Sequence, residues 1–186
     1  MSKESLQLPK TAFSMKANLP QKEPEIINKW EKNKLYEKLR KSSKGKKKFV
    51  LHDGPPYANG HIHMGTALNK ILKDMITRFH QMDGKDSIYV PGWDCHGLPI
   101  EWKIEEEYKK KKKNKDDVPI KDFRSECREF AKKWINIHIK EFKRLGVVGD
   151  FKNYYSTMSN SAEAQIVREL GKFLIDKSLY QGFKPV

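Results

Sequence analysis

The stretch His52-Asp53-Gly54-Pro55-Pro56-Tyr57-Ala58-Asn59-Gly60-His61-Ile62-His63-Met64-Gly65-Thr66 decides the fold of this chain. A short apolar run, Phe49-Val50-Leu51, precedes it, and a long amphipathic pattern follows it. This order predicts a strand, a turn rich in glycine and proline, and the start of a helix. A helix start suits an anion, because its first N–H groups have no partner within the helix and the helix dipole is positive there. We therefore interpret the stretch as a phosphate-binding site for a nucleotide.

A βαβ unit is predicted around this stretch. The first strand covers residues 48–52, a helix follows from about His63 to Gln81, and the second strand covers residues 87–90. The helix prediction rests on apolar residues that recur every three or four positions over four turns, while the opposite side is polar. The apolar residues are Met64, Ala67, Leu68, Ile71, Leu72, Met75, Ile76 and Phe79, and the polar ones are Asn69, Lys70, Lys73, Asp74 and Thr77. The two strands should be parallel and their crossover right-handed.

The carboxyl ends of the two strands should form one ligand site, as is general for such sheets. The first strand ends at Gly54-Pro55-Pro56 and the second at residues 91–97, so we expect His63 and Asp94 to face one pocket. Asp94 could hold an ammonium group there. Cys95 and His96 are sequence neighbours, but neighbours on an extended segment point to opposite sides, which weighs against a thiol–imidazole pair. A zinc site made of these two residues and the earlier histidines lacks the usual ligand spacing.

The remaining segments are predicted to be mostly helical. Residues 1–21 should form an extended arm and residues 41–48 a solvated basic loop, and Glu163 should act as a capping partner at the start of the last helix. Aromatic and apolar residues at helical spacing in the long helix should face the core: Phe123, Cys127, Phe130, Trp134 and Ile137. Helices are expected over residues 24–40, 99–112, 119–145 and 160–178, with a short extended piece at 151–155 and a strand beginning near Tyr180. Because a domain rarely ends by opening a strand, we interpret the chain as truncated.

Composition limits the class of protein. The chain of 186 residues is long enough for one domain, and its formal net charge of +14 suggests a polyanionic partner such as nucleic acid, although a lysine-rich surface would give the same balance. Its two cysteines, Cys95 and Cys127, form no CxxC pair, which argues against a disulfide scaffold or a zinc site. There is no signal-peptide core and no run of eighteen apolar residues, so a cytoplasmic protein without a membrane span is expected.

Two long motifs resemble those of a known family. The run Gly54-Pro55-Pro56-Tyr57-Ala58-Asn59-Gly60-His61-Ile62-His63-Met64-Gly65-Thr66 is similar to the first signature of class I aminoacyl-tRNA synthetases. Within that class, Gly92-Trp93-Asp94-Cys95-His96-Gly97-Leu98-Pro99-Ile100-Glu101 resembles the isoleucyl-tRNA synthetases, as do Leu8-Pro9-Lys10-Thr11 and residues 13–20 of the N-terminal arm. The resemblance implies an α/β fold. An arm and helix over residues 1–47 would precede the first half of a Rossmann-like catalytic domain over 48–186, which ends before the editing insertion.

The resemblance also implies roles for individual residues. The His-Ile-Gly-His signature maps onto His63-Met64-Gly65-Thr66, which gives His63 and Thr66 the catalytic positions. Thr66 departs from the signature, because a hydroxyl can bond to a phosphate oxygen or a ribose but carries no positive charge. Amino-acid binding is implied for Gly54, Pro55 and Asp94, with Asp94 facing the ammonium group. ATP binding is implied for Pro56, Asn59, Gly60, His63, Gly65 and Thr66.

The activity implied is that of an isoleucine–tRNA ligase of protein biosynthesis. Isoleucine and ATP, with Mg²⁺, would give isoleucyl-adenylate and pyrophosphate, and the acyl group would pass to tRNA(Ile). The Lys-Met-Ser-Lys-Ser loop, the editing domain, the anticodon-binding helices and a cysteine cluster are not in the sequence, so activity is expected only when these parts complete the chain. A monomer is expected at full length, and zinc is not expected in this part. The alternatives are a non-catalytic module that binds ATP or tRNA and an inactive gene fragment.

Overall fold

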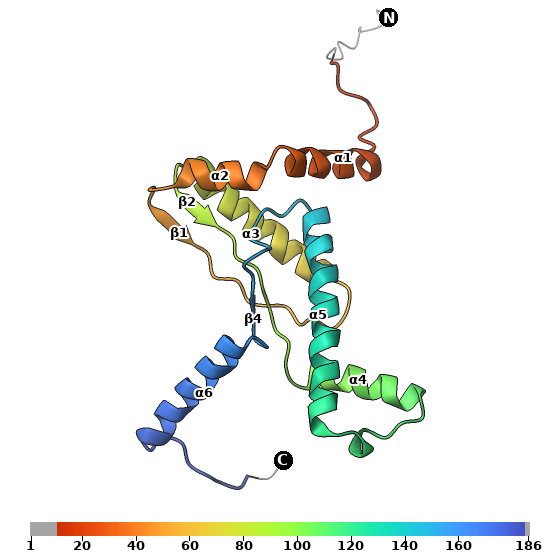
Figure 1. Ribbon diagram of the computed structural model, residues 1–186. Coiled ribbons are helices and arrows are strands. Elements are labelled where there is room, and N and C mark those ends of the chain that lie inside the picture. The colour runs from red at the N-terminus through yellow and green to blue at the C-terminus, as the bar shows by residue number, and fades with distance from the viewer. Residues whose placement is uncertain (1–10, 185–186) are drawn as a thin grey trace, which may run out of the picture.

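Parallel extended segments run through the middle of the computed structural model, which describes residues 11–184 (Figure 1). Strand β1 (Lys48–Val50) pairs in parallel with β2 (Asp86–Ile88), and β3 (Gly92–Trp93) pairs in parallel with β4 (Tyr155–Ser156). Residues 1–10 of the predicted arm and residues 185–186 of the predicted terminal strand lie outside the described residues. The α/β architecture expected from the sequence is thus built on short parallel strands.

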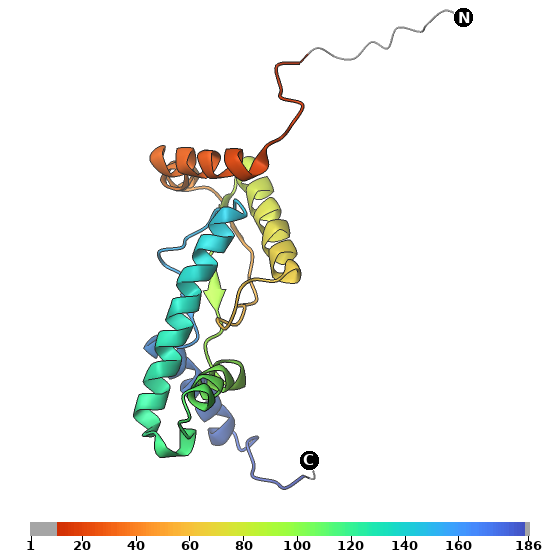
Figure 2. The ribbon, with the colours of Figure 1, turned by 90° about the vertical axis from the view of Figure 1, so that its right-hand side faces the viewer.

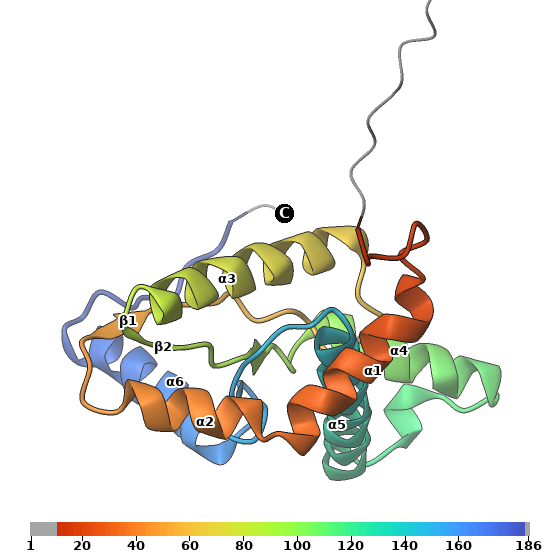
Figure 3. The ribbon, with the colours of Figure 1, turned by 90° about the horizontal axis from the view of Figure 1, so that it is seen from above.

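The predicted βαβ unit is confirmed. Helix α3 (Met64–Met82) connects β1 to β2 and differs from the prediction by one residue at each end. It lies on one side of the strands, and the long helix α5 (Ile120–Arg144) lies on the other, as the side and top views agree (Figures 2 and 3). Helix α3 is the crossover from β1 to β2, and α5 lies in the connection from β3 to β4, so each parallel pair of strands contributes a helix.

Backbone pairing continues beyond the short strands to the carboxyl edge of the sheet. The N–H of Ala58 donates to the carbonyl of Asp94 (3.0 Å), and the N–H of Asp94 donates to the carbonyl of Pro56 (2.9 Å). On the other side, the N–H of Thr157 donates to the carbonyl of Trp93 (3.1 Å). The segment that carries Asp94 therefore lies between the signature loop and the start of the last helix.

The N-terminal region contains two helices where one was predicted. Helix α1 (Leu19–Lys32) begins five residues earlier than expected, because Pro20 fits the first turn, where its missing N–H is not needed. The chain then leaves the helical conformation at Lys34, whose φ is +51°, and α2 (Leu35–Ser43) follows. The prediction of a single helix over 24–40 was wrong, and residues 19–21, predicted to belong to the arm, are part of α1.

The C-terminal half is helical, close to the predicted boundaries. Helix α4 (Leu98–Lys110) leads through a 3₁₀ turn (Lys115–Asp117) to α5. Helix α6 (Asn160–Ile175) is the last helix of the described residues. Residues 180–184 form no strand, contrary to the prediction. The prediction that Glu163 caps the last helix was also wrong. Ser159 caps α6 by accepting from the N–H of Ala162, and the Glu163 carboxylate contacts Arg128 and His96 instead.

The buried core lies between the strands and α5. The buried side of α5 is rotated from the predicted stripe, since Cys127, Phe130 and Trp134 are only partly buried. The α5 residues that are buried are Phe123, Ala131, Ile135, His138 and Phe142. Trp93 of β3 is fully buried and stacks on Phe142.

Helix α3 presents its polar side to the rest of the chain. Amphipathic helices usually bury the apolar side, but here Lys70, Asp74 and Thr77 are buried, whereas Met64 is 84% and Phe79 60% exposed. The polar side is satisfied, because Asp74 accepts a hydrogen bond from the N–H of Val148 (2.9 Å) and Lys70 contacts Asp53. We call the outward row Met64, Leu68, Leu72, Met75, Phe79 and Met82 the apolar stripe of α3.

No helix among residues 11–184 combines the length and the apolar character that a membrane crossing requires.

Candidate active site

A buried carboxylate anchors the start of the signature loop. The side chain of Asp53, which follows β1, has no exposed surface and accepts hydrogen bonds from Lys70 and Lys73 of α3 and from the hydroxyl of Tyr89. Burial works to raise the pKa of Asp53, but these hydrogen bonds outweigh it and hold the pKa below its ordinary value. The cluster ties the end of β1 to α3 and fixes the point where Gly54 and Pro55 begin the turn.

Tyr155 makes a second link to the same point from across the sheet. Its hydroxyl donates to the backbone carbonyl of Asp53 (3.2 Å). To reach Asp53, its ring passes over Gly92 so closely that a Cβ at Gly92 would lie 2.0 Å from the ring. Position 92 therefore requires glycine. The Tyr155 side chain thus connects the segments that carry Asp53, Gly92 and Tyr155 itself.

The far end of the loop is held by α5. His138 accepts a hydrogen bond from the indole N–H of Trp93 on Nδ1 (3.1 Å), so its neutral ring carries the proton on Nε2, which donates to the carbonyl of Gly60 (2.6 Å). Glu141 accepts from the N–H of Ile62 (3.2 Å) and pairs with His61. One face of α5 thus determines the path of the loop just before α3.

His63 caps the N-terminus of α3. Its Nδ1 accepts from the N–H groups of Gly65 (3.1 Å) and Thr66 (3.3 Å), which places the proton on Nε2, 3.2 Å from the Thr66 hydroxyl. The ring folds over Gly65, where an added Cβ would lie 2.9 Å from it. His63 is exposed, so its Nε2 is accessible at the positive end of α3.

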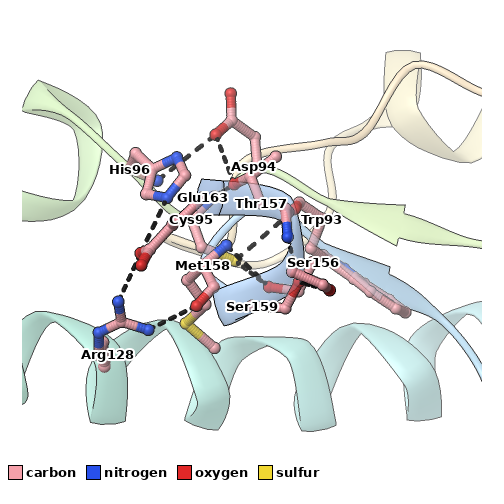
Figure 4. A network of polar contacts seen from close by, with 12 residues as sticks. Trp93, Asp94, Cys95, His96, Arg128, Ser156, Thr157, Met158, Ser159 and Glu163 are labelled. Atoms are coloured by element: carbon pink, nitrogen blue, oxygen red, sulfur yellow. Dashed lines mark hydrogen bonds and ion pairs between the residues drawn. The ribbon is translucent and has the colours of Figure 1, made fainter. Parts of the chain in front are cut away.

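Asp94 lies beside the signature loop, as the strand-edge argument predicted. Its backbone is bonded to Pro56 and Ala58, and its half-buried carboxylate accepts from the hydroxyl of Thr157 (3.2 Å) and the N–H of His96 (3.4 Å) on Oδ1 (Figure 4). The structure therefore brings the predicted residues Pro56 and Asp94 together. A common pocket for His63 and Asp94 stays a prediction.

The neighbouring Cys95 and His96 do not form a pair. The thiol of Cys95 is buried against the hydroxyl of Ser156 (3.3 Å), and burial raises its pKa. The ring of His96 turns instead to Glu163 (3.7 Å). Residues 11–184 hold no group of three or more His, Cys, Asp or Glu side chains that could bind a metal ion.

A cavity of about 510 Å³ lies away from this edge, between α1, α2 and residues 147–153. Its walls include Trp30, Tyr36 and Phe151, and burial raises the pKa of Tyr36 to about 12. None of the predicted site residues lines it. The candidate site is instead the open edge formed by the signature loop and Asp94.

The supporting residues were missed by reasoning from the sequence. They are Asp53, Lys70, Tyr89, His138, Tyr155 and Thr157. Only Asp53 had a usable signal, since a charged residue directly after an apolar strand and before Gly54 is expected to need a partner. Asn59, predicted for ATP, donates in this structure to the carbonyl of Pro99 (3.4 Å).

Comparison with known proteins places this geometry in a family. The family described as tRNA synthetases class I (I, L, M and V) matches residues 25–186. An isoleucine–tRNA ligase of Pelagibacter ubique is 76% identical over the whole chain, which spans 21% of that relative, and one of Mesorhizobium japonicum is 62% identical over 98% of the chain and 18% of the relative. The chain thus spans about a fifth of the length of the curated relatives that it matches.

A solved structure shares the fold. The crystal structure of the ternary complex of Agrobacterium radiobacter K84 agnB2 LeuRS, tRNA and LeuAMS matches with a TM-score of 0.64 and 19% identity, over 89% of this chain and 19% of that chain.

Proposed function

This chain belongs to the class I tRNA synthetases, and from that membership we propose that it contributes the first part of an isoleucine–tRNA ligase. In the complete protein, isoleucine and ATP would be joined to isoleucyl-adenylate with release of pyrophosphate, and the acyl group would pass to tRNA(Ile). The 76% identity to an isoleucine–tRNA ligase over every residue of the chain carries this proposal. A cytoplasmic monomer is the form in which we expect the complete protein to act.

The amino acid would bind where Asp94 meets the signature loop. The carboxylate of Asp94 carries the negative charge needed to bind the ammonium group of isoleucine through a charge-assisted hydrogen bond. Gly54 and Pro55 would form the neighbouring wall, and their place is fixed by the Asp53 cluster and Tyr155. The backbone pairing of Asp94 with Pro56 and Ala58 supports this assignment, because it sets the carboxylate beside that turn.

ATP would bind along the start of α3. The Nε2–H of His63 and the hydroxyl of Thr66 are donors at the positive end of the helix, where phosphate charge is stabilised. Gly65 would let the phosphates approach, and Pro56, Asn59 and Gly60 would contact the rest of the nucleotide, which enters with Mg²⁺ as the substrate. Holding the isoleucine carboxylate beside the α-phosphorus would supply the positioning that this reaction needs. A polyanionic partner, tRNA(Ile), fits the net charge of +14.

A chimera tests the proposal. Residues 1–186 replace the matching segment of the Pelagibacter ubique ligase, and isoleucine-dependent exchange of pyrophosphate into ATP is measured. We expect exchange with isoleucine and much less with valine or leucine, and faster exchange with valine or leucine would refute the assignment. ATP binding without exchange would instead support a non-catalytic binding module.

A further inference from the structure

Thr157 holds one oxygen of the Asp94 carboxylate. Its hydroxyl donates to Asp94 Oδ1 (3.2 Å) and accepts from the N–H of Cys95 (2.8 Å), so it bridges the side chain of Asp94 and the next peptide (Figure 4). The N–H of His96 also reaches Oδ1 (3.4 Å). No hydrogen bond from residues 11–184 reaches Oδ2, which points away from the cluster in Figure 4.

The position of Thr157 is set by the sheet. Thr157 follows β4 directly, and its N–H bonds to the carbonyl of Trp93 (3.1 Å), one step beyond the parallel pair Trp93 and Ser156. This register places the Thr157 side chain next to that of Asp94. The register is set by backbone hydrogen bonds, and it brings the threonine hydroxyl within hydrogen-bond distance of the carboxylate.

A second set of contacts fixes the turn that carries Thr157. Arg128 of α5 donates to the carbonyl of Met158 (2.5 Å) and pairs with Glu163 of α6, which lies 3.7 Å from the ring of His96. The segments on both sides of the Asp94–Thr157 contact are therefore held by one group of charged side chains. Asp94 and Thr157 are both half-buried, so water competes with their contact only in part.

We propose that Thr157 is a positioning residue, which turns the Asp94 carboxylate so that Oδ2 meets the ammonium group of the amino acid. The inference rests on the proposed function, because it takes amino-acid binding by Asp94 as its premise. Two donors on Oδ1 oppose rotation of the carboxylate. A preoriented carboxylate loses less entropy when it binds. Thr157 would act only through Asp94 and would contact neither substrate.

The test uses the chimera and pyrophosphate exchange. Thr157→Val removes the hydroxyl with little change in shape, and we expect the KM for isoleucine to rise roughly tenfold, the scale of one lost hydrogen bond to a charged group. The KM for ATP should stay unchanged. Thr157→Ser keeps the hydroxyl and should restore the KM for isoleucine to within about threefold of the parent. Thr77→Val, the same replacement at a buried threonine of α3, serves as the matched control and should leave both KM values unchanged.

Coupling to Asp94 separates positioning from a general effect on structure. Asp94→Asn should raise the KM for isoleucine, and adding Thr157→Val should raise it no further, because the group through which Thr157 acts is already altered. An unchanged KM for isoleucine in Thr157→Val, an equal rise in the KM for ATP, or full additivity with Asp94→Asn would overturn the inference while the proposed function stands. An unsubstituted chimera without isoleucine-dependent exchange would overturn the proposed function and this inference with it.

Discussion

Replacing Asp53 with asparagine should strongly destabilise the fold of residues 1–186. Asp53 accepts from two lysine ammonium groups and one phenol, and the side chain of Lys70 is only 2% exposed. Asparagine removes the negative charge and leaves the Lys70 ammonium buried without a counter-ion. Breaking a buried ion pair in this way costs roughly 3–5 kcal/mol. That is a large share of the stability of an ordinary domain, which is about 5–15 kcal/mol.

The pH dependence of stability should change in the same variant. The pKa of Asp53 is lower in the folded chain than the ordinary value of 3.8, so its stabilisation is fully present above that value and is lost as the pH falls through the folded pKa. The asparagine side chain that replaces it cannot titrate. The difference in unfolding free energy between the parent and Asp53→Asn should therefore shrink as the pH is lowered below about 4.

Urea unfolding of the 186-residue chain, followed by tryptophan fluorescence, measures both effects. Asp83→Asn is the matched control, because Asp83 is half exposed and pairs with Lys85 at the surface (3.0 Å), so its loss should stay below about 1 kcal/mol. Adding Lys70→Met to Asp53→Asn should recover part of the stability, since the unpaired ammonium is then removed. Equal losses in Asp53→Asn and Asp83→Asn would refute the reasoning.

Three further predictions concern single positions. Gly92→Ala should lower the unfolding free energy measured in urea by roughly 1–3 kcal/mol, because the added Cβ forces the Tyr155 ring away from Asp53. Gly54→Ala is the matched control and should cost less, because a Cβ added there meets no atom within 4 Å. Burial raises the pKa of the Cys95 and Cys127 thiols, that of Cys127 to about 11. Iodoacetamide at pH 8 should therefore label both thiols far more slowly in the folded chain than in urea, and equal labelling rates would contradict this prediction. Ser159→Ala should cost about 1 kcal/mol by removing the cap of α6, seen as faster amide exchange in its first turn, whereas Ser161→Ala should have little effect.

Local patterns predicted most of the secondary structure. The period of α3 and the apolar runs beside it predicted the βαβ unit to within a residue or two, because both signals lie within one short stretch. The break between α1 and α2 had no such signal, since it depends on Lys34 adopting a positive φ, which lysine rarely does. Periodicity also shows that α3 has two sides without showing which one faces inward, and the polar side proved to be buried.

Topology predicted part of the candidate site. The rule that parallel strands end at one edge brought Asp94 to the signature loop, which the backbone bonds to Pro56 and Ala58 confirm. Thr157 and His138 could not be predicted in this way, because their partners Asp94 and Gly60 lie 63 and 78 residues away in the sequence. Such contacts depend on the register of β4 and on the rotation of α5, which only the assembled fold determines.

The apolar stripe of α3 reverses the usual relation between residue type and tolerance to substitution. In most domains a leucine-to-lysine change on an amphipathic helix is damaging and a change of a polar residue is neutral. Within residues 11–184, Leu68 is 60% exposed whereas Lys70, two positions later, is buried. A deep mutational scan that scores the stability of this chain alone should therefore show that substitutions on the polar side of α3 destabilise it and that substitutions on the apolar stripe are tolerated. If the same scan of a longer protein found stripe positions that no longer tolerate substitution, those positions would mark the surface that another part of the protein covers.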